Sequence, residues 1–94
     1  MTNKNQKNIG DKNHEEEAIY LKTIGQRLKY FRIKAGYTNY EYFAYDHNLS
    51  RPQYGKYEAG ANIQLNTLIK ILKAMNVTLE EFFKGIDLPK SENK

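Results

Sequence analysis

The residues whose side-chain chemistry most clearly suggests a binding role are two cations on one short segment, Arg51 and Lys56. In a helix over residues 51–58, positions i, i+1, i+4 and i+5 share a broad face, which carries Arg51, Pro52, Gly55 and Lys56. A guanidinium donates parallel hydrogen bonds and an ammonium adds a point charge, so this face could bind a polyanion. The simpler interpretation of the same charges is a solvated helix face without a ligand.

The residue types that catalysis or metal binding requires are scattered. Cysteine is absent, His14 and His47 have no ligand-spaced partners, and the only serines are Ser50 and Ser91. No glycine-rich phosphate loop is present, and Glu15–Glu17 suit the positive end of a helix. We therefore expect no enzymatic activity, no catalytic residues, no cofactor and no bound metal.

Length and composition are those of one small globular domain. The chain has 94 residues, of which 39% are hydrophobic and 28% are charged. Its formal net charge of +4 favours an anionic partner, but only weakly. The best apolar stretch, residues 68–72, is interrupted by Lys70 and is too short to cross a membrane. The N-terminus is polar and unlike a signal peptide, so we expect a cytoplasmic protein with no membrane partner.

Helix start and stop signals recur between residues 13 and 86. Four pairs have capping-box spacing: Asn13 with Glu16, Thr38 with Glu41, Ser50 with Gln53, and Thr78 with Glu81. A fifth helix follows from the spacing of apolar residues between Leu65 and Met75. The expected helix ends are followed by residues that accept a left-handed conformation: Gly36, Gly60, Asn76 and Gly85. The sequence therefore predicts an all-α fold with helices near 14–35, 39–46, 51–58, 65–75 and 79–84.

The segments outside these helices differ in composition. Residues 1–13 are rich in lysine and asparagine, and we expect a disordered basic tail there. Residues 87–94 contain Pro89 and are expected to form a C-terminal tail. A single domain should therefore occupy residues 14–86.

The two short helices at 39–46 and 51–58 are joined by a tight turn at residues 47–49. Helices that cross closely need a small residue near the contact, and Ala44 meets this requirement. Asn48 stands four positions later, where the turn requires a left-handed residue. The second helix would be about 12 Å long, which matches the width of the major groove of DNA.

The order and spacing of the residues from Ile24 to Phe83 resemble the Cro/repressor (XRE-type) helix-turn-helix transcriptional regulators. The resemblance is carried by Ile24-Gly25-Gln26-Arg27-Leu28, Arg32, Gly36, Glu41-Tyr42-Phe43-Ala44, Leu49-Ser50-Arg51, Tyr57-Glu58-Ala59-Gly60, Leu65-Asn66-Thr67-Leu68 and Val77-Thr78-Leu79-Glu80-Glu81-Phe82-Phe83. It implies a five-helix, lambda-repressor-like domain and a sequence-specific transcriptional regulator. Such a protein would read the major groove of double-stranded DNA with the helix near 51–58. A homodimer on a two-fold symmetric site, with half-sites about 34 Å apart, would supply the specificity that one helix lacks.

The resemblance also implies roles for individual residues. Contacts to DNA bases are expected from Arg51, Pro52, Gln53 and Lys56. Contacts to phosphates are expected from Tyr40, Ser50, Asn62 and Gln64. Arg32 and Glu58 match a pair that usually forms a structural ion pair between the first helix and the recognition helix.

The sequence departs from the family pattern around the turn. Tyr54 and Tyr57 replace the usual aliphatic core residues, and Asn48 replaces the commoner glycine. The segment from Thr38 to Ala44 is one residue longer than usual, so the first short helix could start differently. These departures leave the fold expectation unchanged but weaken the transfer of individual contacts.

Three local alternatives stay open at the recognition helix. Either Ser50 caps the helix, or Arg51 becomes the cap and Pro52 the first helical residue. Gly55 could allow close approach to DNA or tight packing against another helix. The side chain of Gln53 could complete a capping box instead of contacting a base.

The partners also have alternatives. The apolar residues near the C-terminus offer more area than one short helix easily buries, which predicts a dimer interface; they are Phe82, Phe83, Ile86 and Leu88. Alternatively, the phenylalanines only close the core. The functional alternatives are an antitoxin-like DNA-binding module with a toxin partner, and a protein-interaction module that no longer reads DNA. Binding that is salt-sensitive and sequence-selective would distinguish a DNA reader from an interaction module.

Overall fold

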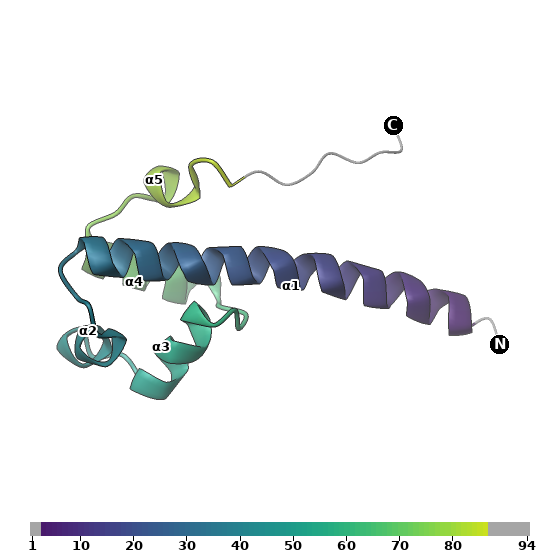
Figure 1. Ribbon diagram of the computed structural model, residues 1–94, viewed down its shortest axis with the longest axis horizontal. Helices are drawn as coiled ribbons and strands as arrows, with labels where there is room; N and C mark the ends of the chain where they lie inside the picture. Colours follow the sequence, from purple (N-terminus) through teal and green to yellow (C-terminus); the bar gives the residue numbers. More distant parts are fainter. Residues whose placement is uncertain (1–2, 87–94) are drawn as a thin grey trace.

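The computed structural model describes residues 3–86, with side chains described from residue 14 onward. Within this range the regular elements are all helices: α1 (Asn3–Lys34), α2 (Tyr40–Asp46), α3 (Arg51–Glu58), α4 (Leu65–Met75) and α5 (Leu79–Phe83). α1 is a long rod whose C-terminal half carries the shorter helices, with α2 and α3 on one side and α5 on the other (Figure 1). The predicted all-α fold with five helices is confirmed.

α1 begins earlier than the sequence predicted. The expected start at residue 14 is wrong, because the helix extends back to Asn3 and Asn13 lies inside it rather than at its N-cap. A helix that already exists adds further residues at little cost, and no proline interrupts residues 3–34. From Asn3 onward, the segment expected to be a disordered tail is therefore helical. The expected C-terminal tail at 87–94 lies outside the described residues, and the domain limits stay predictions.

α2 starts at a different cap from the one expected. Asn39, not Thr38, is the N-cap residue, and its Oδ1 accepts hydrogen bonds from the amides of Glu41 (2.7 Å) and Tyr42 (3.3 Å). Asparagine is at least as good an N-cap as threonine, so the shift by one position has no cost in capping. By contrast, Thr78 caps α5 through the predicted capping box.

The turn between α2 and α3 has the predicted conformation. Asn48 adopts a φ of 60°, in the left-handed region that asparagine tolerates better than most residues. The next amide, that of Leu49, donates a 2.8 Å hydrogen bond to the carbonyl of Ala44. Ala44 is fully buried, and its small side chain lets the two helices cross closely.

The core lies between the C-terminal half of α1 and the shorter helices. Its buried apolar residues are Leu28, Phe43, Ala44, Tyr54, Leu68, Ile71, Leu72, Met75 and Phe82. Phe82 packs against Phe31 of α1, with 6.0 Å between the ring centroids. Its assignment to a dimer interface is therefore wrong, because a side chain with no exposed surface cannot contact a second copy. Phe83, the next residue, stays partly exposed.

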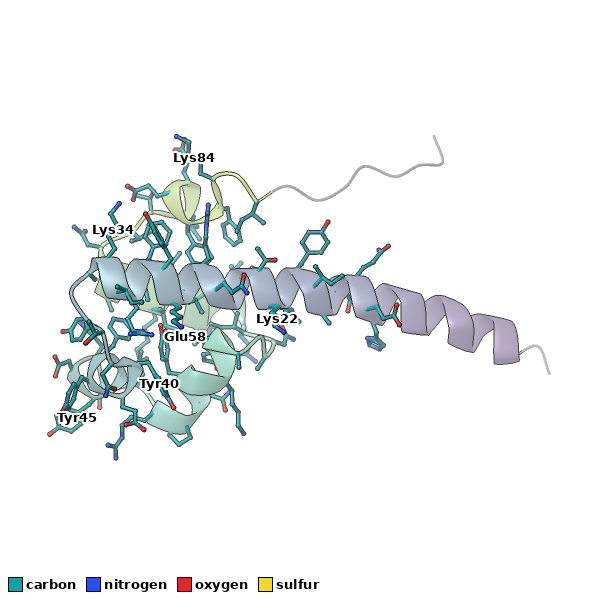
Figure 2. All side chains as sticks on the ribbon, viewed as in Figure 1. Lys22, Lys34, Tyr40, Tyr45, Glu58 and Lys84 are labelled. Carbon is teal, nitrogen blue, oxygen red and sulfur yellow. The ribbon has the colours of Figure 1, made fainter. Side chains whose placement is uncertain are left out.

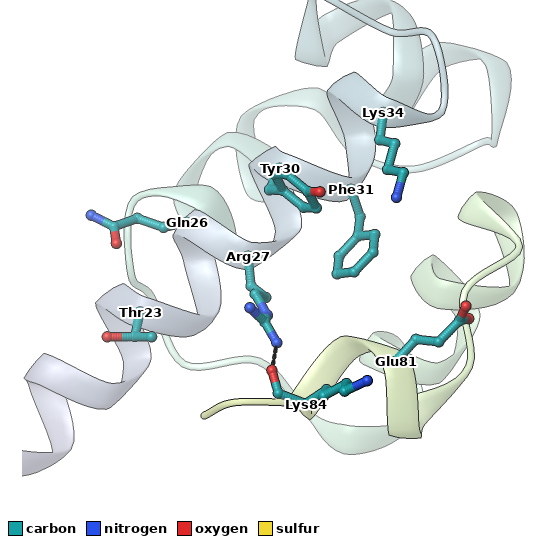
Figure 3. Close-up of a pocket in the computed structure, with 8 residues that line it drawn as sticks. All are labelled: Thr23, Gln26, Arg27, Tyr30, Phe31, Lys34, Glu81 and Lys84. Carbon is teal, nitrogen blue, oxygen red and sulfur yellow. Dashed lines mark hydrogen bonds between the residues drawn. The ribbon is translucent and has the colours of Figure 1, made fainter. Parts of the chain in front are cut away.

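Arg27 of α1 holds α5 in place. Its Nε donates to the carbonyl of Phe82 at 2.7 Å. Its Nη2 donates to the carbonyl of Lys84, as Figure 3 shows. The carbonyls at a helix end have no partner within the helix, so Arg27 satisfies groups that would otherwise need water. A pocket of about 580 Å³ remains between α1 and α5, with Tyr30, Phe31 and Lys34 in its lining.

Candidate nucleic-acid interface

Ser50 fixes the start of α3. Its Oγ accepts a hydrogen bond from the Gln53 amide at 3.3 Å, so α3 begins at Arg51. Pro52 follows in the first turn, where its missing N–H removes no helical hydrogen bond. Of the two starts that the sequence left open, the structure has the one with Ser50 as the cap. Among the described residues the Gln53 side chain makes no return bond to Ser50, so it stays available for a ligand.

The outer face of α3 carries the four residues expected to contact bases. Arg51, Pro52, Gln53 and Lys56 are all exposed. In the described part of the chain, neither Arg51 nor Lys56 has a carboxylate within ion-pair distance. α3 therefore presents two uncompensated positive charges to solvent.

The opposite face of α3 is turned inward, as the tyrosine spacing predicted. Tyr54 is 1% exposed and Tyr57 is half-buried. The Tyr54 hydroxyl finds no hydrogen-bond partner among the described residues. Burial raises the pKa of Tyr54, so its phenol stays neutral at physiological pH.

Arg32 of α1 and Glu58 of α3 are in contact, as the family resemblance implied. Arg32 Nε lies 2.8 Å from Glu58 Oε2, and Nη2 lies 3.0 Å from Oε1. The third nitrogen, Nη1, donates to the carbonyl of Tyr37 at 2.6 Å. Arg32 is only 3% exposed, and the hydrogen bonds to Glu58 raise the pKa of its guanidinium. The pair joins the last turn of α3 to α1, and Figure 2 shows Glu58 beneath α1.

A second contact between α1 and α3 was missed by the sequence reasoning. A Cβ built on Gly25, which is buried, would lie 2.5 Å from the carbonyl oxygen of Glu58 and 2.6 Å from that of Tyr57. Only glycine allows α1 to come this close to the end of α3. The available signal was a glycine inside a predicted helix, where it costs about 1 kcal/mol relative to alanine.

Gly55 packs closely against the side chain of a neighbouring helix. A Cβ at this position would lie 2.8–2.9 Å from atoms at the outer end of the Tyr40 side chain. Tyr40 is half-buried at the start of α2 (Figure 2), so the glycine lets α2 and α3 contact each other through this ring. Of the two explanations that the sequence left open, the structure supports tight packing against another helix, and approach to DNA stays a prediction.

The remaining residues expected to contact phosphates are exposed. Ser50 is the cap of α3, and Gln64 is the N-cap residue of α4, where its side chain makes no capping hydrogen bond. Asn62 lines a cavity of about 550 Å³ together with residues of α1, which are His14, Glu17, Tyr20 and Leu21. The loop after α3 therefore carries one amide beside α1 and another at the start of α4.

Within residues 3–86, none of the helices combines the length and the hydrophobicity that crossing a bilayer requires. No group of three or more histidine, cysteine, aspartate or glutamate residues could hold a metal ion there.

Comparison with known families identifies the unit formed by these helices. The model of the helix-turn-helix family of Cro/C1 type matches residues 28–82, more than half of the chain. The matched segment runs from α1 to α5 and contains α2, the turn, α3 and the Arg32–Glu58 pair. No curated protein and no solved structure matches the chain. This family is a DNA-binding family and not an enzymatic one. The chain therefore belongs to the Cro/C1-type (XRE) helix-turn-helix family.

Proposed function

We propose that this protein is a transcriptional regulator that binds double-stranded DNA sequence-specifically through the outer face of α3. The observation that carries the proposal is that Arg51 and Lys56 are exposed on α3 and have no carboxylate partners in the described part of the chain. This helix lies within the segment that matches a DNA-binding family. A helix of this length enters the major groove, where an arginine can donate two hydrogen bonds to one guanine. The net charge of +4 adds a general attraction to phosphates.

The roles proposed for the contact residues follow from their positions on α3 and the nearby loops. Arg51, Pro52, Gln53 and Lys56 contact base edges, because they occupy the exposed face of the recognition helix. The phosphate contacts come from four positions around this face, which are Tyr40, Ser50, Asn62 and Gln64. Phosphate contacts set the orientation of the helix, whereas base contacts select the sequence. Cytoplasmic location remains a prediction.

Removing the Arg51 side chain should separate sequence reading from general binding. Once selection from random duplex DNA has given a preferred site, Arg51→Ala should reduce discrimination against single-base variants by about 5- to 150-fold. A decrease of about 1 in the slope of log affinity against log salt for Lys56→Ala, with discrimination unchanged, would instead assign Lys56 to a phosphate. Lys84→Ala is a matched control, because Lys84 follows α5 on the other side of α1 from α3 (Figure 2). A natural protein that binds all duplexes equally, with weak salt dependence, would contradict the proposal.

We also propose that the protein binds as a homodimer on a two-fold symmetric site. Phe83 and Ile86 are the described residues that stay available for such an interface, because Phe82 is buried. Leu88, the fourth residue expected there, lies outside the described residues. Phe83→Ser should shift the natural protein from dimer to monomer in sedimentation experiments at micromolar concentration. A monomer for the natural protein, both free and on DNA, would rule out this arrangement.

A further inference from the structure

The contact between α2 and α3 depends on the ring of Tyr40 and on the lack of a side chain at Gly55. Relative to a Cβ built on Gly55, Tyr40 Cε1 lies at 2.8 Å, and Cζ and the hydroxyl oxygen lie at 2.9 Å. The outer end of the ring therefore rests directly on the backbone of α3. The ring of Tyr54 lies close to the same side chain, with 6.3 Å between the centroids and 35° between the planes.

This contact places the Tyr40 hydroxyl at the edge of the outer face of α3. Gly55 follows Arg51 by one helical turn and directly precedes Lys56, so it lies on the face that those two cations define. Tyr40 is half-buried, which leaves part of its side chain accessible. The Tyr37 hydroxyl donates to Asp46 at 2.9 Å, whereas the Tyr40 hydroxyl makes no hydrogen bond within the described residues.

We propose that Gly55 is a positioning residue for Tyr40: the bare backbone at Gly55 holds the ring so that its hydroxyl can donate to a DNA phosphate beside the bases that α3 reads. In this arrangement Gly55 itself makes no contact with DNA. The role of the hydroxyl rests on the proposed function, but the packing of the ring on Gly55 does not. Any side chain at position 55 would displace the ring and remove the phosphate contact, even though position 55 lies on the recognition helix.

The packing is tested by introducing Gly55→Ala into three proteins: the natural one, Tyr40→Phe and Tyr40→Ala. With the ring removed by Tyr40→Ala, Gly55→Ala should raise the midpoint of urea unfolding, because alanine is the better helix residue. In the natural protein and in Tyr40→Phe the ring is present, so the same substitution should lower the midpoint or leave it unchanged. An equal rise in all three proteins would show that the ring does not lie on Gly55 and would overturn the proposal.

The positioning role is tested by measuring DNA affinity in the same proteins at fixed salt and at temperatures where all are folded. In the natural protein, Tyr40→Phe and Gly55→Ala should each weaken binding by about 10- to 150-fold, the effect expected for one hydrogen bond to a charged group. In Tyr40→Phe, the addition of Gly55→Ala should cause no further loss of affinity, although it still disturbs the packing. A role of Gly55 in the fold alone would not produce this difference between stability and affinity.

Two other outcomes have definite meanings. If Gly55→Ala weakens DNA binding equally with and without the Tyr40 hydroxyl, Gly55 approaches DNA directly and the positioning role is wrong. If the natural protein shows no sequence-selective DNA binding, the proposed function fails. The unfolding experiments would then still decide whether Gly55 holds the Tyr40 ring.

Discussion

Replacing Glu58 with alanine is expected to lower the free energy of unfolding by about 3–5 kcal/mol, because it leaves a buried guanidinium without its anionic partner. Arg32 is 3% exposed, and an arginine side chain keeps its proton in proteins, so the variant cannot avoid the penalty by losing the positive charge. In a domain of this size, a loss of that order lowers the thermal midpoint by roughly 12–40 °C. Circular dichroism during heating and urea titration would measure both quantities. DNA affinity should fall mainly because less of the protein is folded.

A control variant isolates the effect of the ion pair. Glu80→Ala removes an exposed carboxylate from α5 and should change the free energy of unfolding by no more than about 0.5 kcal/mol. If Glu58→Ala were as stable as Glu80→Ala, the Arg32–Glu58 pair would have no part in holding α3 against α1.

The second large effect is expected from the smallest possible substitution, Gly25→Ala. It should destabilise the fold by about 3 kcal/mol, although alanine is ordinarily the better helix residue by about 1 kcal/mol. The added methyl would lie 2.5 Å from the carbonyl oxygen of Glu58, and a backbone oxygen cannot move aside as a flexible side chain can. α1 and the end of α3 would have to separate, which would also lengthen the hydrogen bonds between Arg32 and Glu58.

Urea unfolding of Gly25→Ala beside Gln26→Ala would test this expectation. Gln26 is the next residue of α1 and is exposed, so its replacement should be nearly neutral. A Gly25→Ala protein more stable than the natural one would mean that helix propensity dominates and that α1 and α3 are not in close contact at this point.

The features that the sequence predicted correctly are those fixed by local chemistry. Asn48 and Asn76 adopt left-handed backbone angles, which asparagine tolerates better than most residues do. Ser50 and Thr78 cap helices because their side-chain oxygens reach nearby backbone amides. These effects act within a few residues and do not depend on the rest of the fold. The number of helices and most of their limits could therefore be derived before the structure was known.

The features that the sequence could not decide depend on residues far apart in the chain. Whether Phe82 faces its own core or a second copy depends on where Phe31 lies. Whether Gly55 faces DNA or a ring depends on where α2 places Tyr40. The start of α1 was also missed, because no local signal blocks propagation of the helix beyond residue 14. Candidate residues could thus be named from sequence, while their partners required coordinates.

The two contacts between α1 and α3 both involve the last turn of α3, through Glu58 and through the carbonyls of Tyr57 and Glu58. The first turn, which carries Arg51, makes neither contact with α1; it follows the Ser50 cap and is held to α2 through the buried Tyr54, which packs on Phe43. Substitutions near residues 47–50 could therefore re-aim Arg51 while the anchored end of the helix keeps its place. If α3 reads DNA as proposed, such an arrangement would allow the preferred sequence to change at little cost to folding.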